Sequence, residues 1–312
     1  VLDQAKKVKR NFFDKLKFMA ITSSNLDEFF MIRVGSLYNY IDYHKQRVDY
    51  SSLREIPFRK KLFGEIHEFY QNQSNHYQNA IKPEFKKNGF DVLNVSELED
   101  SERGKVKEYF KKTIFPMLTP MVYDSYHTFP SLVNKLLIFG VVTIDHRDEV
   151  EKKRLSFIQI PTNLPRFFEI YREDQLVFVP IEEVIRAYIH KLFRNITIQS
   201  VGLFRITRNG DFTLDESDDI EANFLEELRR KLKTRKTGRV VRIEVEEQAS
   251  KWMLRILKER WELDDDNIFM LSEGNLIDYT SFWQVVNHNE FRNNIPKLHT
   301  PIKPVSMIDI GA

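Results

Sequence analysis

Residues 18–34 read FMAITSSNLDEFFMIRV, which is the densest local pattern in the chain. Apolar residues spaced three to four apart predict helix on both sides of the polar group at its centre. Ser24 with Asp27, or Asn25 with Glu28, has the spacing of a capping box, and the acids would lie where a helix dipole favours them. The pattern therefore predicts a helix, a break and a new helix.

Two interpretations of this break fit the residues. In the first, Ser24, Asn25 and their neighbours only cap a helix, which is the usual role of such residues before an apolar run. In the second, the corner between the helices is a polar pocket. Asn25 would then offer both a hydrogen-bond donor and an acceptor to a ligand such as the edge of a purine. The residues alone leave both interpretations open.

The same apolar spacing predicts a helical bundle over residues 1–90. Beyond Pro130 the pattern changes to short strand-like runs mixed with helices, which favours an α+β fold. The predicted strands cover 136–144, 155–160, 176–179, 196–207, 240–246 and 268–271, and the predicted helices cover 95–115, 181–193, 218–233, 248–259 and 276–286. We therefore expect three parts: an all-α N-terminal domain at 1–90, an α+β head domain at 91–294, and a proline-containing linker at 295–312.

Two local predictions are specific enough to be tested. The helix at 95–115 is expected to begin with a capping box formed by Ser96 and Glu99. The run at 240–246 alternates cleanly, so it predicts a half-buried strand. Val241, Ile243 and Val245 would face the core, and Arg242, Glu244 and Glu246 would face water.

Composition limits the classes of function. With 42% hydrophobic residues and 25 Phe among 312 residues, the chain is globular and not disordered. The absence of cysteine excludes disulfides, thiolate zinc sites and a cysteine nucleophile, and it fits a reducing compartment. Neither standard phosphate loop is present, no group of carboxylates and histidines has metal-ligand spacing, and no signal peptide or spanning segment is found. The net charge of +2 argues against a general affinity for DNA.

One basic stretch stands out from this near neutrality. No acid interrupts Arg229, Arg230, Lys231, Lys233, Arg235, Lys236, Arg239 and Arg242. Such a surface would attract a polyanion, either single-stranded RNA or polyphosphate. The competing interpretation is a solvated helix face, because the preceding Glu226 and Glu227 have the spacing of helix ion pairs.

Five ordered motifs resemble the polyphosphate kinases of the histidine-phosphorylating class. Residues 18–34 are similar to that family's FLAI-SSNLDEFF-VRV signature, and 117–130 to its LTP…D..HPFP segment, with Thr128 where the family usually has proline. The other three matches are FVPIEEVI at 178–185, FRITRNGD at 204–211 and RKTGRVVRIE at 235–244. These matches span nearly the whole chain.

The resemblance implies an enzyme of four parts that reversibly transfers the terminal phosphate of ATP to polyphosphate through a phosphohistidine. It also implies that this chain is the N-terminal and head portion, beginning inside the family pattern and ending before the catalytic domains. The family's catalytic histidines, the arginines that hold phosphate, and the Mg²⁺ site would then lie outside the chain. No catalytic residue or metal ligand is therefore expected here, and the fragment alone is expected to be inactive.

Some binding roles are implied within the chain. Asn25 matches the family residue at the adenine end of the ATP tunnel, so the resemblance makes it an ATP contact. Polyphosphate becomes the expected ligand of the basic stretch, with contacts at Arg229, Arg230, Lys233, Arg235, Lys236 and Arg239. The expected assembly is a cytoplasmic homodimer formed through the head domain, with membrane association left open. The alternatives are a non-enzymatic module for RNA or polyphosphate, and a purely structural assembly domain.

Overall fold

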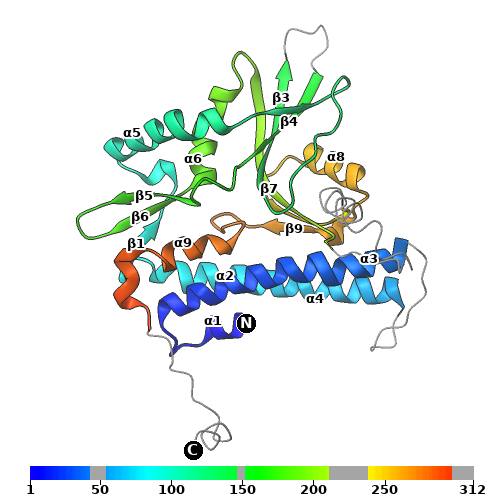
Figure 1. The fold of residues 1–312 in the computed structure, drawn as a ribbon. Helices are drawn as coiled ribbons and strands as arrows, with labels where there is room; N and C mark the ends of the chain where they lie inside the picture. Colours follow the sequence, from blue (N-terminus) through cyan, green and yellow to red (C-terminus); the bar gives the residue numbers. More distant parts are fainter. Residues whose placement is uncertain (43–53, 146–151, 211–237, 297–312) are drawn as a thin grey trace, which may run out of the picture.

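A computed structural model describes residues 1–42, 54–145, 152–210 and 238–296. A layer of N-terminal helices lies along one side of the molecule, and two β-sheets with their own helices lie above it (Figure 1). The predicted α+β class, with helices first and mixed elements after them, is confirmed. None of the described helices combines the length and apolar content that crossing a bilayer requires.

The helical layer begins at the first residues of the chain. Its elements are α1 (Leu2–Lys6), α2 (Phe12–Phe29), a π-helical turn (Phe30–Val34), α3 (Gly35–Asp42), α4 (Glu55–His76) and a second π-helical turn (Tyr77–Ile81). Asn11 caps α2, since its side chain accepts from the backbone N–H of Phe13 at 2.9 Å. Helix α4 packs on α2 in the opposite direction: the Phe63 ring lies 5.9 Å from that of Phe30, and Gln73 donates to Ser23 at 3.3 Å.

The predicted break at Ser24 and Asn25 is wrong. Helix α2 runs through both residues, and the π-helical turn leads directly into α3. The buried positions Leu16, Met19 and Ser23 keep one helical face against the rest of the protein, and Phe30 continues it. Because the apolar face is not interrupted, continuing the helix satisfies the backbone and buries more surface than a turn would.

The larger sheet has six strands in the order β2-β4-β3-β7-β8-β9. They are β2 (Met121–Tyr123), β4 (Lys152–Gln159), β3 (Leu137–Asp145), β7 (Thr197–Arg208), β8 (Val240–Glu246) and β9 (Ile268–Leu271). All neighbours are antiparallel except β8 and β9, which α8 (Lys251–Trp261) connects in parallel. The strands predicted at 136–144 and 155–160 are confirmed as β3 and β4, and they pair with each other in antiparallel orientation.

The smaller sheet lies beside it, in the order β1-β6-β5. Its strands are β1 (Phe90–Val92), β6 (Leu176–Pro180) and β5 (Phe167–Tyr171), and its helices are α5 (Asp100–Tyr109) and α6 (Ile181–Tyr188). Two capping boxes are present before α5, but they pair Asn94 with Glu97 and Glu99 with Glu102. The predicted box of Ser96 and Glu99 is wrong because a 3-10 turn at Val95–Glu97 separates the two starts.

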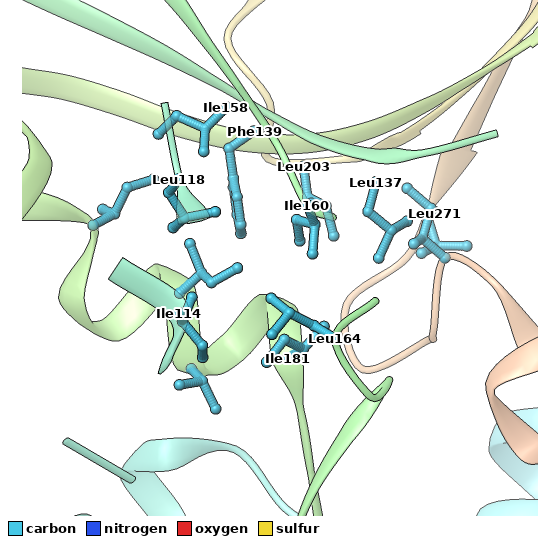
Figure 2. Packing of buried hydrophobic residues seen from close by; sticks show 14 of the residues in the cluster. Ile114, Leu118, Leu137, Phe139, Ile158, Ile160, Leu164, Ile181, Leu203 and Leu271 are labelled. Atoms are coloured by element: carbon cyan, nitrogen blue, oxygen red, sulfur yellow. The ribbon is translucent and has the colours of Figure 1, made fainter. Parts of the chain in front are cut away.

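Apolar side chains fill both faces of the larger sheet. On one face Phe139, Ile158 and Leu203 point toward α6 and the turn after α5, as Figure 2 shows with Ile114 and Ile181 opposite them. On the other face α8 packs closely on β3 and β7, where Gly140 and Gly202 lie opposite each other in register. A Cβ on Gly202 would lie 2.9 Å from the Cβ of Ala249, so the missing side chain is what allows this approach.

A further apolar cluster joins the two ends of the described chain. Residues after β9 form a 3-10 turn (Tyr279–Ser281), α9 (Phe282–Val286) and a second 3-10 turn (Asn289–Asn294), so only part of the helix predicted over 276–286 is present. The Phe291 ring lies 5.1 Å from that of Phe13 and 5.4 Å from that of Phe90. The final described segment is therefore part of the packing of the N-terminal helices, and the domain boundary at residue 90 stays a prediction.

Candidate functional site

Helix α2 carries Asn25, the residue for which the resemblance predicts an ATP contact. Asn25 lies on the outward side of α2 and is exposed, as are Ser24 and Glu28. Ile32, one turn beyond Glu28, is 37% exposed. The Asn25 amide makes no hydrogen bond to any residue that the structure describes, so its donor and its acceptor are both available. The expected pocket at an interhelical corner is not formed by the described residues, since no corner exists there.

On the inward side of the same turn, ion pairs join α2 to the larger sheet. Asp27 is 4% exposed and points at β7 and β8. Arg205 of β7 donates to it from Nη1 at 3.0 Å and also from Nη2, and Arg242 of β8 donates to it from Nη2. One carboxylate on α2 therefore binds two guanidinium groups on neighbouring strands.

The remaining polar atoms of this buried cluster are paired as well. Glu244 accepts from Arg205 Nη1 at 2.7 Å and lies 3.1 Å from Arg242 Nη2. Arg242 also donates to the Thr207 hydroxyl from Nε at 3.1 Å and from Nη2 at 2.8 Å. Asp278, just before α9, lies 3.9 Å from Arg205 Nη2. We call Asp27, Arg205, Arg242, Glu244 and Asp278 the buried ion cluster.

Electrostatics in the buried ion cluster follow from its composition. Two guanidinium groups face three carboxylates in a region with little water. Burial opposes the charge of Arg205, but Asp278, Asp27 and Glu244 together hold its pKa above the ordinary value. Burial raises the pKa of Glu244, and the nearby Asp27 and Asp278 add to this effect against the two arginines. Burial also opposes the charge of Asp278, but Arg205 and Arg166 hold its pKa below the usual range.

This cluster connects elements and leaves no room for a substrate. The cavity beside it measures about 10 Å³, far below the volume of a nucleotide. Through Asp27 it fixes the rotation and the height of α2 on the sheet, because two guanidinium groups from different strands define where one carboxylate can lie. Its chemical consequence is indirect: the Asn25 side of α2 is presented in a single orientation.

Two sequence predictions about these residues are wrong. Asp27 does not cap a helix, because α2 is continuous. Arg242 and Glu244 do not face water: they are 1% and 4% exposed, because α2 and its π-helical turn cover that face of β8. Glu246, which was also expected to face water, is partly buried and pairs with Arg186. The signal that could have found the cluster is the placement of arginines and glutamate at alternate positions of two apolar strands.

The predicted basic stretch is only partly visible. Arg239 is partly buried, donates to the carbonyl of Glu262 at 3.4 Å and has its guanidinium 4.5 Å from the Tyr38 ring centre. Arg242, which the sequence placed in the same stretch, belongs to the buried ion cluster. Arg229, Arg230, Lys233, Arg235 and Lys236 lie outside the described residues, as does the predicted helix at 218–233. Polyanion binding there stays a prediction.

Three of the described histidines, His67, His76 and His127, have local contacts. His67 stacks on Phe269 with ring centres 4.1 Å apart, His76 lies 3.2 Å from the carbonyl of Ala5, and His127 lies 2.8 Å from Asp124. Burial lowers the pKa of His76, which favours its neutral form. Within the described ranges, no three His, Asp or Glu side chains come together in a way that would hold a metal ion.

Comparison with known proteins matches two successive parts of the chain. Family models for the polyphosphate kinase N-terminal domain and the polyphosphate kinase middle domain match residues 1–93 and 101–285. The chain is 34% identical over 276 residues to a polyphosphate kinase of Bacillus cereus, covering 87% of this chain and 39% of that protein. It is 35% identical over 296 residues to one from Halalkalibacterium halodurans, covering 92% of this chain and 40% of that protein.

A solved structure agrees at the level of the fold. The crystal structure of a polyphosphate kinase from Porphyromonas gingivalis superposes with a TM-score of 0.73 at 16% identity. The match covers 100% of this chain and 42% of that chain. The chain thus spans about two fifths of the length of the relatives that it matches.

Proposed function

Because the chain belongs to the polyphosphate kinase family and spans its N-terminal and middle domains, we propose that it is part of a larger phosphotransferase. In that enzyme it would form the side of the ATP-binding site that contacts the nucleotide. That enzyme would move the terminal phosphate of ATP to polyphosphate through a phosphohistidine outside this chain. Mg²⁺ would be held in that outside portion as well, as the resemblance to the family implies. Polyphosphate synthesis needs all the parts together, so the 312-residue chain alone is expected to make none.

The role of this chain is to present Asn25 to the base or sugar of ATP. The observation that carries the proposal is the contrast across one turn of α2. Asn25 is exposed with its amide unbonded among the described residues, while Asp27, two residues later, is locked into the buried ion cluster. A fixed helix with a free amide is a preorganised half of a binding site, and the other half would come from the catalytic domains.

Kinetics of the full-length enzyme test the role of Asn25. In Asn25→Ala, the KM for ATP should rise about twofold to tenfold, the range that losing one neutral hydrogen bond predicts, while kcat and the KM for polyphosphate stay near wild type. Asn72→Ala is a matched control, because Asn72 is an exposed asparagine on α4. An unchanged KM for ATP in Asn25→Ala would remove Asn25 from the site.

Two assays test the location of the chemistry. The full-length enzyme should produce acid-insoluble polyphosphate from Mg-ATP, and the 312-residue chain should not. Synthesis by the chain alone would contradict the placement of the catalytic groups. Dimerisation through the head, a cytoplasmic location and the absence of DNA binding belong to the same proposal, and sedimentation of the full-length enzyme tests the first of them.

A further inference from the structure

A hollow of about 410 Å³ opens between the ends of α5 and α6. One wall is the π-helical turn Phe110–Ile114 that follows α5, and the other is the 3-10 turn Ile189–Leu192 that follows α6. Both helices lie on the side of the smaller sheet away from α2, the helix that carries Asn25 (Figure 1). Its lining consists of Phe110, Lys111, Phe115, His190, Lys191 and Arg194.

This lining is cationic without a counterion. It contains three permanent positive charges and one histidine but no acid. Among the residues that the structure describes, Lys111, Lys191 and Arg194 form no ion pair with a carboxylate. The Lys191 ammonium lies instead over aromatic rings, 5.0 Å from the centre of Tyr188 and 6.0 Å from that of Phe110.

Neighbouring cations on the same segment behave differently. Lys112, adjacent to Lys111, pairs with Glu108 at 2.5 Å, and Arg103 pairs with Asp100. The three charges that face the hollow thus have no acidic partner among the residues that the structure describes, in contrast to Lys112 and Arg103. Like charges gathered around an apolar floor repel one another and create a local positive potential, which an anion relieves.

We propose that this hollow binds a segment of polyphosphate chain at a distance from the nucleotide. Three cations from two separate segments of the chain suit an anion whose charge is spread along its length. The Arg194 guanidinium can bind phosphate oxygens in pairs, and Lys111 and Lys191 act as point charges. The inference rests on the proposed function and deepens it, since it adds a second contact for the polymer that the enzyme would extend.

Binding by the 312-residue chain tests this inference separately from catalysis. Long-chain polyphosphate is titrated into the wild type and into the triple variant Lys111→Gln/Lys191→Gln/Arg194→Gln across a range of salt concentrations. The matched control is Lys9→Gln/Lys60→Gln/Lys61→Gln, which removes the same charge from exposed lysines of the helical layer. Circular dichroism melts establish that all three proteins are folded.

The hollow variant should bind about tenfold more weakly, because each exposed ion pair contributes a factor of about two. Its slope of log K against log salt should fall by about 2, as expected for three lost phosphate contacts. In the wild type, polyphosphate should slow amide hydrogen exchange at 110–115 and 189–194. ATP tested in the same way should give little protection there, and equal protection by ATP would assign the hollow to nucleotides and overturn the polymer assignment.

Three other results would overturn the inference. They are no binding of polyphosphate by the wild-type chain, equal weakening in both triple variants, and protection confined to other segments. Failure of the wild-type full-length enzyme to make polyphosphate would contradict the proposed function. It would not change the conclusion from the binding experiment on the 312-residue chain. If the full-length enzyme is active but its 312-residue portion does not bind polyphosphate, only the present inference is contradicted.

Discussion

Replacing Asp27 with alanine should destabilise the fold more than any nearby surface change. Asp27 accepts from three guanidinium nitrogens at 4% exposure, so the variant leaves Arg205 and Arg242 buried with unpaired donors. Each hydrogen bond to a charged group is worth about 1.5–3 kcal/mol, but Glu244 keeps part of the pairing because it contacts both arginines. The expected loss is therefore about 3–5 kcal/mol in the free energy of unfolding, as for other broken buried ion pairs.

Urea denaturation followed by circular dichroism measures this loss, with Glu28→Ala as the control from the next residue on the exposed side of α2. The control should change the free energy of unfolding by less than about 0.5 kcal/mol. Asp27→Asn should lie between the two, since it keeps one acceptor oxygen and loses the charge. A cost for Asp27→Ala below about 1 kcal/mol, or equal to that of Glu28→Ala, would refute the view that the buried ion cluster fastens α2 to the sheet.

Three further results are expected. Arg172 holds the pKa of Glu102 at about 2, below the ordinary 4.5. Their ion pair therefore stabilises the fold above pH 4.5 by at most roughly 3 kcal/mol and loses this contribution as the pH falls toward 2. Arg172→Leu should consequently be less stable at pH 6 and show a flatter acid limb in pH titrations of stability, and an unchanged limb would contradict this. Gly202→Ala should cost about 1–3 kcal/mol by thermal or urea melts, because its Cβ would lie 2.9 Å from the Cβ and 3.2 Å from the Cα of Ala249. Asn25→Ala should leave the melting temperature of the chain unchanged, and a clear drop would show that its amide has a structural partner.

The sequence predicted the strands correctly where a local apolar pattern alone decides the structure. Strands β3, β4 and β6 follow from short apolar runs bounded by polar turns, and the structure contains all three. The motif resemblance also predicted the correct family and its N-terminal and middle portions. Short elements were missed: β1 and β2 have three residues each, too few to show a period.

The buried ion cluster could not be predicted from pattern alone. Charged residues at alternate positions of a strand usually face water, and that assumption failed for Arg242 and Glu244 because a helix from the start of the chain covers that face. Which element covers which sheet face is a long-range property of the fold. The same long-range packing turned a predicted capping acid, Asp27, into a buried ligand for two arginines. It also kept Asn25 within a continuous helix where the sequence predicted a break.

The contact between Phe13 and Phe291 has a consequence for how the protein is made. A ribosome adds about 5–20 residues per second, so roughly a quarter of a minute to a minute passes between the appearance of the first ring and the second. During that time the nascent α1 and α2 have emerged, while the aromatic surface formed with Phe85 and Phe90 still lacks its final cover. The packing of the first helices is therefore completed only when Phe291 has been made. A nascent chain interrupted before Phe291 would leave the rings of Phe13 and Phe90 without this cover.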